Sequence, residues 1–133
     1  MVGMFKEITV VAKDRIGLLA DVSEFLGRAG INIESISSDA SNGTSITRLV
    51  TASASQARQV LEKAGGFKVV DANILVIKLR DRPGELANAT RILSDNHINI
   101  HSAYLLGREG SESLVAMKTG NYAKSKKLLK NYL

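Results

Sequence analysis

The strongest constraint on the fold of this chain is an internal repeat. The segment that begins Asp14-Arg15-Ile16-Gly17 returns without a gap 67 residues later, beginning Asp81-Arg82-Pro83-Gly84. Self-similarity at a fixed period marks repeated folding units, so we predict two copies of one unit, with the chemistry where polar residues recur beside an apolar frame. Ten of 22 aligned positions are identical: Asp14/Asp81, Arg15/Arg82, Gly17/Gly84, Leu19/Leu86, Ala20/Ala87, Leu26/Leu93, Ile31/Ile98, Asn32/Asn99, Ile33/Ile100 and Ser35/Ser102.

The repeat divides the 133 residues into two predicted domains, 1–72 and 73–133. Each is near the lower size limit for independent folding, so we expect the copies to share or augment their cores. With 44% hydrophobic and 23% charged residues, the composition is that of a globular protein. The absence of cysteine excludes disulfides, thiolate metal sites and cysteine nucleophiles. No long apolar run or signal-peptide pattern is present, and we therefore expect a cytoplasmic protein.

The residue pattern of each copy predicts the same order of elements: strand, helix, two strands and helix. Apolar residues at helical spacing follow each Asp-Arg-x-Gly turn, namely Leu19, Val22, Leu26 and Ala29 in the first copy, and Gly30 predicts the end of that helix. The Ile-Asn-Ile triplet of each copy predicts the start of a half-buried second strand. The other expected elements are first strands at 7–12 and 74–79, hairpin turns at 41–43 and 107–110, third strands at 45–53 and 111–119, second helices at 55–64 and 121–132, and a fourth strand at 67–72 in the first copy only.

This order predicts an α+β protein made of two ferredoxin-like βαββαβ units in tandem. Each unit should have an antiparallel sheet with its helices on one face. The second unit lacks its last strand, and the edge so exposed is covered by the N-terminal segment, by another chain or by nothing. The sequence does not choose among these three.

The candidate site is the loop between the first strand and the first helix of each copy. Helix N-termini carry unpaired N–H groups, so Gly17 or Gly84 would let a carboxylate approach the backbone. The adjacent Asp14 or Asp81 would accept from an ammonium group, with Asn32 or Asn99 as a further donor and acceptor. Together these groups suit a free amino acid. The alternative is structural: the aspartates cap their helices, Pro83 is a first-turn proline, and the glycines tighten the turns.

Fold order, repeat and loop together resemble the ACT domains, which are amino-acid-sensing modules of enzymes such as aspartokinase and phosphoglycerate dehydrogenase. The resemblance rests on the two Asp-Arg-x-Gly loops and the two Ile-Asn-Ile triplets, and it covers almost the whole chain. It implies that effectors lie between the loop of one domain and the second strand of its neighbour. The ligand-binding residues it implies are Asp14, Arg15, Ile16, Gly17, Leu18 and Asn32 in the first copy and Asp81, Arg82, Gly84 and Asn99 in the second.

The two copies depart from the ACT pattern in different places. Ile16 replaces the usual proline of the first loop, while Glu85 places a carboxylate where an apolar residue is common. Because Glu85 would repel a ligand carboxylate, the sequence favours the first site over the second. Ala12 and Leu79 stand where some members bring a histidine to the ligand, which predicts fewer polar contacts and weaker binding or another ligand.

The sequence therefore predicts a non-enzymatic regulatory module that binds a small amino acid and acts on a partner in amino-acid metabolism. We find no catalytic motif, expect no cofactor, and interpret His97 and His101 as structural residues rather than a metal site. Unpaired sheet edges favour a homodimer. One alternative is a nucleic-acid-associated accessory protein that uses the basic C-terminal helix, although the few aromatic residues disfavour RNA recognition. Another is a ligand-free dimerisation subunit of an amino-acid enzyme.

Overall fold

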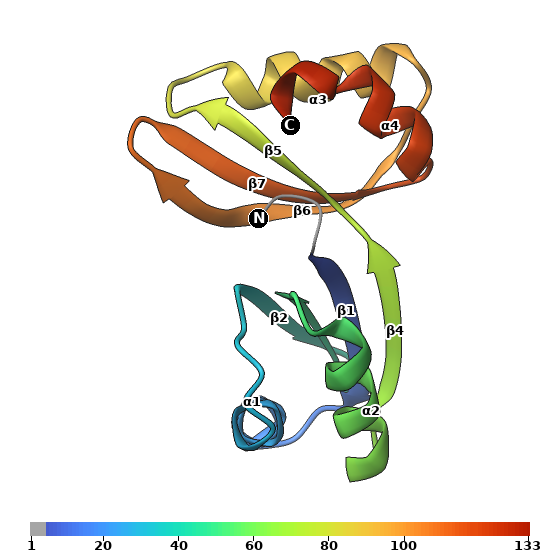
Figure 1. Ribbon diagram of the computed structural model, residues 1–133. Helices are drawn as coiled ribbons and strands as arrows, with labels where there is room; N and C mark the ends of the chain where they lie inside the picture. Colours follow the sequence, from blue (N-terminus) through green and yellow to red (C-terminus); the bar gives the residue numbers. More distant parts are fainter. Residues whose placement is uncertain (1–4) are drawn as a thin grey trace. The chain divides into compact units, whose positions relative to one another are not determined.

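The computed structural model describes residues 5–133 and divides into two compact units. The boundary between the units falls between Ala72 and Asn73. Each unit is a sheet with two helices packed on one face (Figure 1). The predicted fold of two ferredoxin-like units is confirmed.

The first unit contains the complete set of six elements. Its four-stranded sheet has the order β2-β3-β1-β4, with β1 paired antiparallel to β3 and β3 antiparallel to β2. A turn at Asn42 and Gly43, both with positive φ, joins β2 to β3 as predicted. The elements are β1 (Lys6–Lys13), α1 (Leu18–Arg28), β2 (Ser35–Ser41), β3 (Thr44–Thr51), α2 (Ala54–Ala64) and β4 (Lys68–Asn73).

The core of the first unit lies between the sheet and its helices. Ile8 of β1 is opposite Leu49 of β3, and both are fully buried under Leu26 of α1. The helix places Leu18 in this core and leaves Leu19 44% exposed, so Leu19, which the sequence groups with Val22 and Leu26 at helical spacing, lies outside the core. The reason is the start of the helix: with α1 beginning at Leu18, the buried positions Leu18, Val22 and Leu26 recur every four residues.

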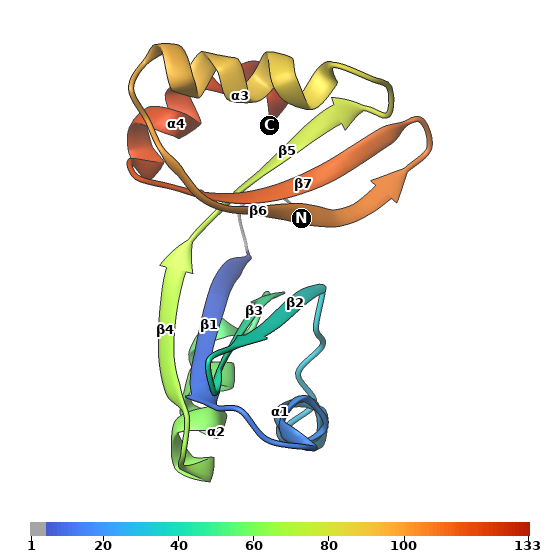
Figure 2. The same cartoon turned by 180° about the vertical axis from the view of Figure 1, so that it is seen from behind.

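The second unit has a three-stranded sheet of order β5-β7-β6, with β7 antiparallel to both neighbours. The prediction that this unit lacks its last strand is confirmed within the described residues, since a short 3₁₀ helix follows its second helix. Figure 2 shows β6 and β7 as the longest hairpin of the chain. The elements are β5 (Leu75–Arg80), α3 (Glu85–Asp95), β6 (Ile100–Glu109), β7 (Glu112–Thr119), α4 (Tyr122–Leu128) and η1 (Lys130–Tyr132).

The C-terminal helix is shorter than the sequence predicted. α4 ends at Leu128, and Leu129 is fully buried in the core with Ile77 and Leu93. The chain then continues as η1, whereas a single helix over 121–132 was expected. The buried face of α4 continues to this point, since Ser125 and Leu129 are four residues apart and both fully buried.

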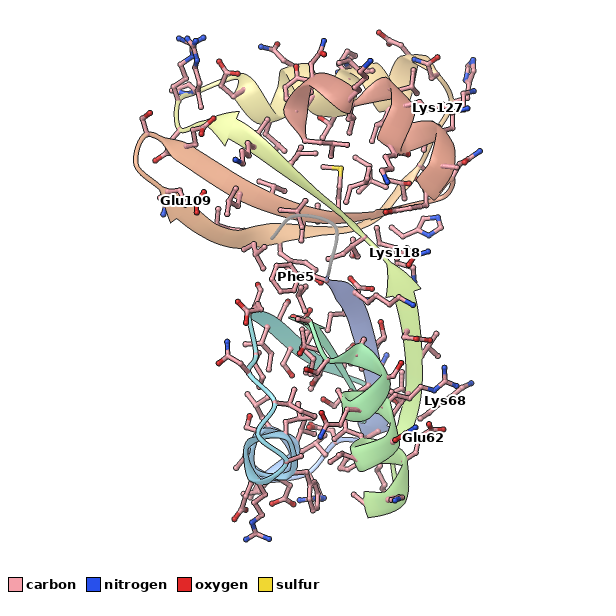
Figure 3. All side chains as sticks on the ribbon, in the orientation of Figure 1. Phe5, Glu62, Lys68, Glu109, Lys118 and Lys127 are labelled. Atoms are coloured by element: carbon pink, nitrogen blue, oxygen red, sulfur yellow. The ribbon has the colours of Figure 1, made fainter. Side chains whose placement is uncertain are left out.

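Two expected features of the second strands were also wrong. The Ile-Asn-Ile triplets precede the strands almost entirely, because β2 begins at Ser35 and β6 at Ile100. The N–H groups of Ile31 and Ile98 instead donate to the carbonyls of Leu26 and Leu93, at 3.0 and 2.9 Å, and so close the ends of the helices. The second hairpin turn is also shorter than expected: β6 runs to Glu109, labelled in Figure 3, with an irregularity in pairing between Leu105 and Gly107.

Candidate functional site

Both candidate loops end in a glycine that starts the following helix. Gly17 has φ 86° and Gly84 has φ 88°, a left-handed conformation that other residues adopt only with strain. Neither helix start receives a side-chain hydrogen bond. The alternative in which Asp14 and Asp81 cap their helices is therefore wrong, and the side chains of the loops leave the N–H groups of the first turns uncapped.

Each loop is fixed to the hairpin of its own unit by one backbone hydrogen bond. The N–H of Asp14 donates to the carbonyl of Gly43 at 2.8 Å, and the N–H of Asp81 donates to Ser111 at the same distance. The two partners occupy the β2–β3 and β6–β7 turns. The backbone of each aspartate is therefore held in place relative to the hairpin of its own unit.

The arginine of each loop is turned onto the helix that follows. Arg15 Nη2 is 2.6 Å from Asp21 Oδ2, and Arg82 Nε is 2.5 Å from Glu85 Oε1. The negative charge of Glu85 is thus offset by Arg82 within the second loop. This pairing reduces the repulsion that Glu85 alone would exert on a ligand carboxylate.

The two aspartates differ in their partners. Asp81 Oδ2 accepts a hydrogen bond from Arg108 Nε of β6 at 3.1 Å. Asp14 makes no ion pair within residues 5–133, and its side chain is exposed. The carboxylate of Asp14 is therefore available for a cationic ligand group, whereas that of Asp81 is shared with an arginine.

The asparagines lie at the opposite ends of the helices from the loops. Gly17 begins α1 and Asn32 follows its end, and Gly84 and Asn99 flank α3 in the same way. Each helix has 11 residues, which corresponds to about 16 Å of length. A single unit consequently does not bring its own loop and asparagine together.

The remaining candidate residues lie in different environments. Asn32 Nδ2 donates to Glu34 Oε2 at 2.5 Å, whereas Asn99 lines a shallow depression with Arg91 and His97. Ile16 is fully exposed at the tip of the first loop, while Leu18 is buried in the core. Leu18 therefore serves the core of the first unit.

A cavity adjoins the second loop. It has a volume of about 270 Å³ and lies between the start of α3 and the strands β6 and β7. Asp81, Arg82 and Glu85 stand at it, together with apolar side chains that the sequence reasoning missed. The sequence alone does not identify these side chains, because they become neighbours only through the pairing register of the strands. The cavity is lined by Leu79, Arg80, Asp81, Arg82, Glu85, Leu86, Ala103, Tyr104, Leu105, Ser113 and Val115.

The described residues contain neither a metal-binding cluster nor a membrane-spanning helix. Residues 5–133 contain no group of three or more histidine, aspartate or glutamate side chains arranged to hold a metal ion. In the same part of the chain no helix combines the length and apolarity needed to cross a bilayer.

Comparison with known proteins identifies relatives of the whole repeat. The family model of the ACT domain pair matches residues 4–132. A solved protein of Bacteroides thetaiotaomicron superposes with a TM-score of 0.85 at 23% identity, over 98% of this chain and 88% of that chain. The ligand-free regulatory subunit of aspartate kinase from Thermus thermophilus gives a TM-score of 0.71 at 14% identity, over 97% and 92%. No curated protein matches the chain.

Proposed function

The chain belongs to the family of ACT domain pairs, and from that premise we propose that it is a regulatory module that binds a small amino acid. The observation that carries this proposal is the pair of uncapped helix starts at Gly17 and Gly84, each with an aspartate three residues earlier. The N–H groups of a helix start suit a carboxylate, and a neighbouring aspartate suits an ammonium group. Both polar ends of an amino acid therefore have a counterpart in each loop.

The asparagine of the site comes from a second copy of the chain in this proposal. About 16 Å of helix separates each loop from the asparagine of its own unit. A homodimer that brings Asn32 or Asn99 to the loop of its partner would complete the polar contacts. β2 and β6 are the outer strands of their sheets within the described residues, and outer strands can take part in such an interface.

The module acts without catalysis and passes the bound state to another protein. An amino acid shifts the equilibrium between two arrangements only if its affinity for them differs, and that difference sets the strength of coupling. The proposed partner is an enzyme or regulator of amino-acid metabolism in the cytoplasm. No cofactor is needed for this role.

The test is a thermal-shift screen of the twenty amino acids with the full chain. A ligand at a hundred times its dissociation constant stabilises by about 2.7 kcal/mol, which corresponds to roughly ten degrees in a domain of this size. Asp14→Ala and Asp81→Ala should each reduce the shift given by the amino acid that binds. Glu62→Ala serves as the control, because Glu62 is an exposed carboxylate of α2 outside both loops.

One observation favours the nucleic-acid alternative as a second candidate. Lys124, Lys126, Lys127 and Lys130 are all exposed on α4 and η1, and Figure 3 labels Lys127 there. This alternative requires polynucleotide binding that weakens steeply with salt. A silent amino-acid screen combined with such binding would replace the sensor proposal. A silent screen without it would favour the dimerisation subunit.

A further inference from the structure

The cavity of the second unit is apolar inside and charged at its rim. Leu79, Leu105 and Val115 come from three neighbouring strands and share the face of the sheet that carries the helices. Leu86 of α3 adds a further apolar group. In Figure 1 and Figure 2 the start of α3 and the β6–β7 turn lie at the same end of this unit. Small-molecule sites typically combine such an apolar interior with a few polar groups that fix orientation.

The first unit has smaller or polar residues in place of the strand residues that line the cavity of the second. In the second unit Ile77 of β5 pairs with Val115, which pairs with Leu105. The matching row of the first unit joins Val10, Thr47 and Ser38, and the hydroxyls of Ser38 and Thr47 are 2.9 Å apart. Leu79 is likewise replaced by Ala12 in the repeat. Leu79, Leu105 and Val115 therefore form an apolar lining that the first copy lacks, whereas Leu86 matches Leu19 of that copy.

Two side chains beside the cavity are exposed although they are large and apolar. Leu105 is 46% exposed and Leu86 is 48% exposed. A ligand seated between them would remove apolar surface from water, which is the driving force for binding of apolar groups. The volume of about 270 Å³ exceeds the roughly 150 Å³ that holds one benzene molecule, so an aliphatic or aromatic side chain fits.

The rim carries charges of both signs. The Nε–H of Arg82 donates to Glu85. A guanidinium has five N–H donors, so the others remain for a ligand carboxylate. Asp81 accepts from Arg108 and has further lone pairs for an ammonium group. Both ends of a zwitterion therefore meet an opposite charge at the mouth of an apolar cavity.

We propose that the second unit takes an amino acid with an apolar side chain, whose side chain enters the cavity between α3 and β6 while its charged groups stay at the rim. This inference rests on the proposed function and names the ligand class for one of its two sites. It reverses the preference for the first site that the sequence alone favours.

The test uses isothermal titration calorimetry of the full chain with two sets of amino acids. Leucine, isoleucine, valine, methionine and phenylalanine form the apolar set, and serine, threonine, aspartate and lysine form the polar set. At least one apolar amino acid should bind tenfold more tightly than every member of the polar set. Leu105→Ser, which copies Ser38 of the first unit, should weaken that binding at least tenfold.

The matched control is Val70→Ser. Val70 is an apolar residue of the edge strand β4 and is 46% exposed, the same fraction as Leu105. This variant should leave the affinity within twofold of the original. Ala103→Phe fills the same cavity from β6 with a larger side chain and should also abolish binding, which gives an independent answer if Leu105→Ser unfolds the protein.

The outcomes separate this inference from the function on which it rests. Binding of polar amino acids alone would overturn the inference and leave the sensor function standing. Binding of apolar amino acids that is unaffected by Leu105→Ser and Ala103→Phe would place the ligand elsewhere and would also overturn it. Silence with all twenty amino acids would overturn both.

Discussion

The second residue after the first helix of each unit allows one prediction to be tested twice within the same chain. Gly30 and His97 occupy the same repeat position and both have positive φ, 73° and 58°. Each precedes the isoleucine whose N–H closes the helix end, at 3.0 Å to Leu26 and 2.9 Å to Leu93. The two helix ends therefore share one geometry, but only the first has the residue that adopts it without strain.

The expected effect of His97→Gly follows from two opposing terms. Relief of the left-handed backbone gains about 1–2 kcal/mol, and the greater freedom of glycine in the unfolded chain costs about 0.5–1 kcal/mol. The imidazole is exposed and makes no hydrogen bond or ion pair within residues 5–133, so little else is lost. We expect a net stabilisation of about 0.5 kcal/mol, and the opposite sign for Gly30→His, where an added Cβ meets no atom within 4 Å.

The assay is urea unfolding followed by far-ultraviolet circular dichroism on the two single variants and the double variant. Amide hydrogen exchange at Ile31 and Ile98 reports the two helix ends separately. The double variant should return close to the original free energy of unfolding. Destabilisation by His97→Gly, or a gain in stability from Gly30→His, would refute the argument that backbone conformation controls these helix ends.

Three further substitutions test the packing of α3 and its start. Leu93→Ala should cost about 2–5 kcal/mol of unfolding free energy because Leu93 is fully buried, whereas Leu86→Ala should cost less than about 1 kcal/mol because Leu86 is 48% exposed. Equal costs in urea unfolding would contradict the burial described for α3. Gly84→Ala should cost about 1 kcal/mol through backbone strain alone, since open space surrounds the position. An unchanged unfolding midpoint for this variant would show that the loop relaxes to a negative φ.

The fold was predictable because every element except the fourth strand occurs twice in the sequence. Polar and apolar periods agreed in both copies, and the order of elements allows few topologies. The identity of Leu19 and Leu86 was misleading, however, because repetition does not say on which side of a helix a residue lies. That side depends on where the helix begins, and this start is set by the positive φ of Gly17 and Gly84.

The candidate site was only partly accessible from the sequence. The loops and their polar residues could be named, since the motif is continuous in the chain. The distance between Asp14 and Asn32 could not be predicted, because it depends on the length and direction of α1. The cavity could not be predicted either, as Leu105 and Val115 become neighbours only through a strand register that contains an irregularity next to Leu105.

The helix between each loop and its asparagine bears on how the affinity for the amino acid depends on protein concentration. About 16 Å of helix separates the two halves of each site within a unit, and if a second copy of the chain supplies the asparagine, as proposed, a single copy holds only half-sites. Ligand uptake and self-association are then linked by mass action, and each strengthens the other. Dilution of the protein would weaken its apparent affinity for the amino acid, and the module would report the abundance of its own chain as well as that of its effector.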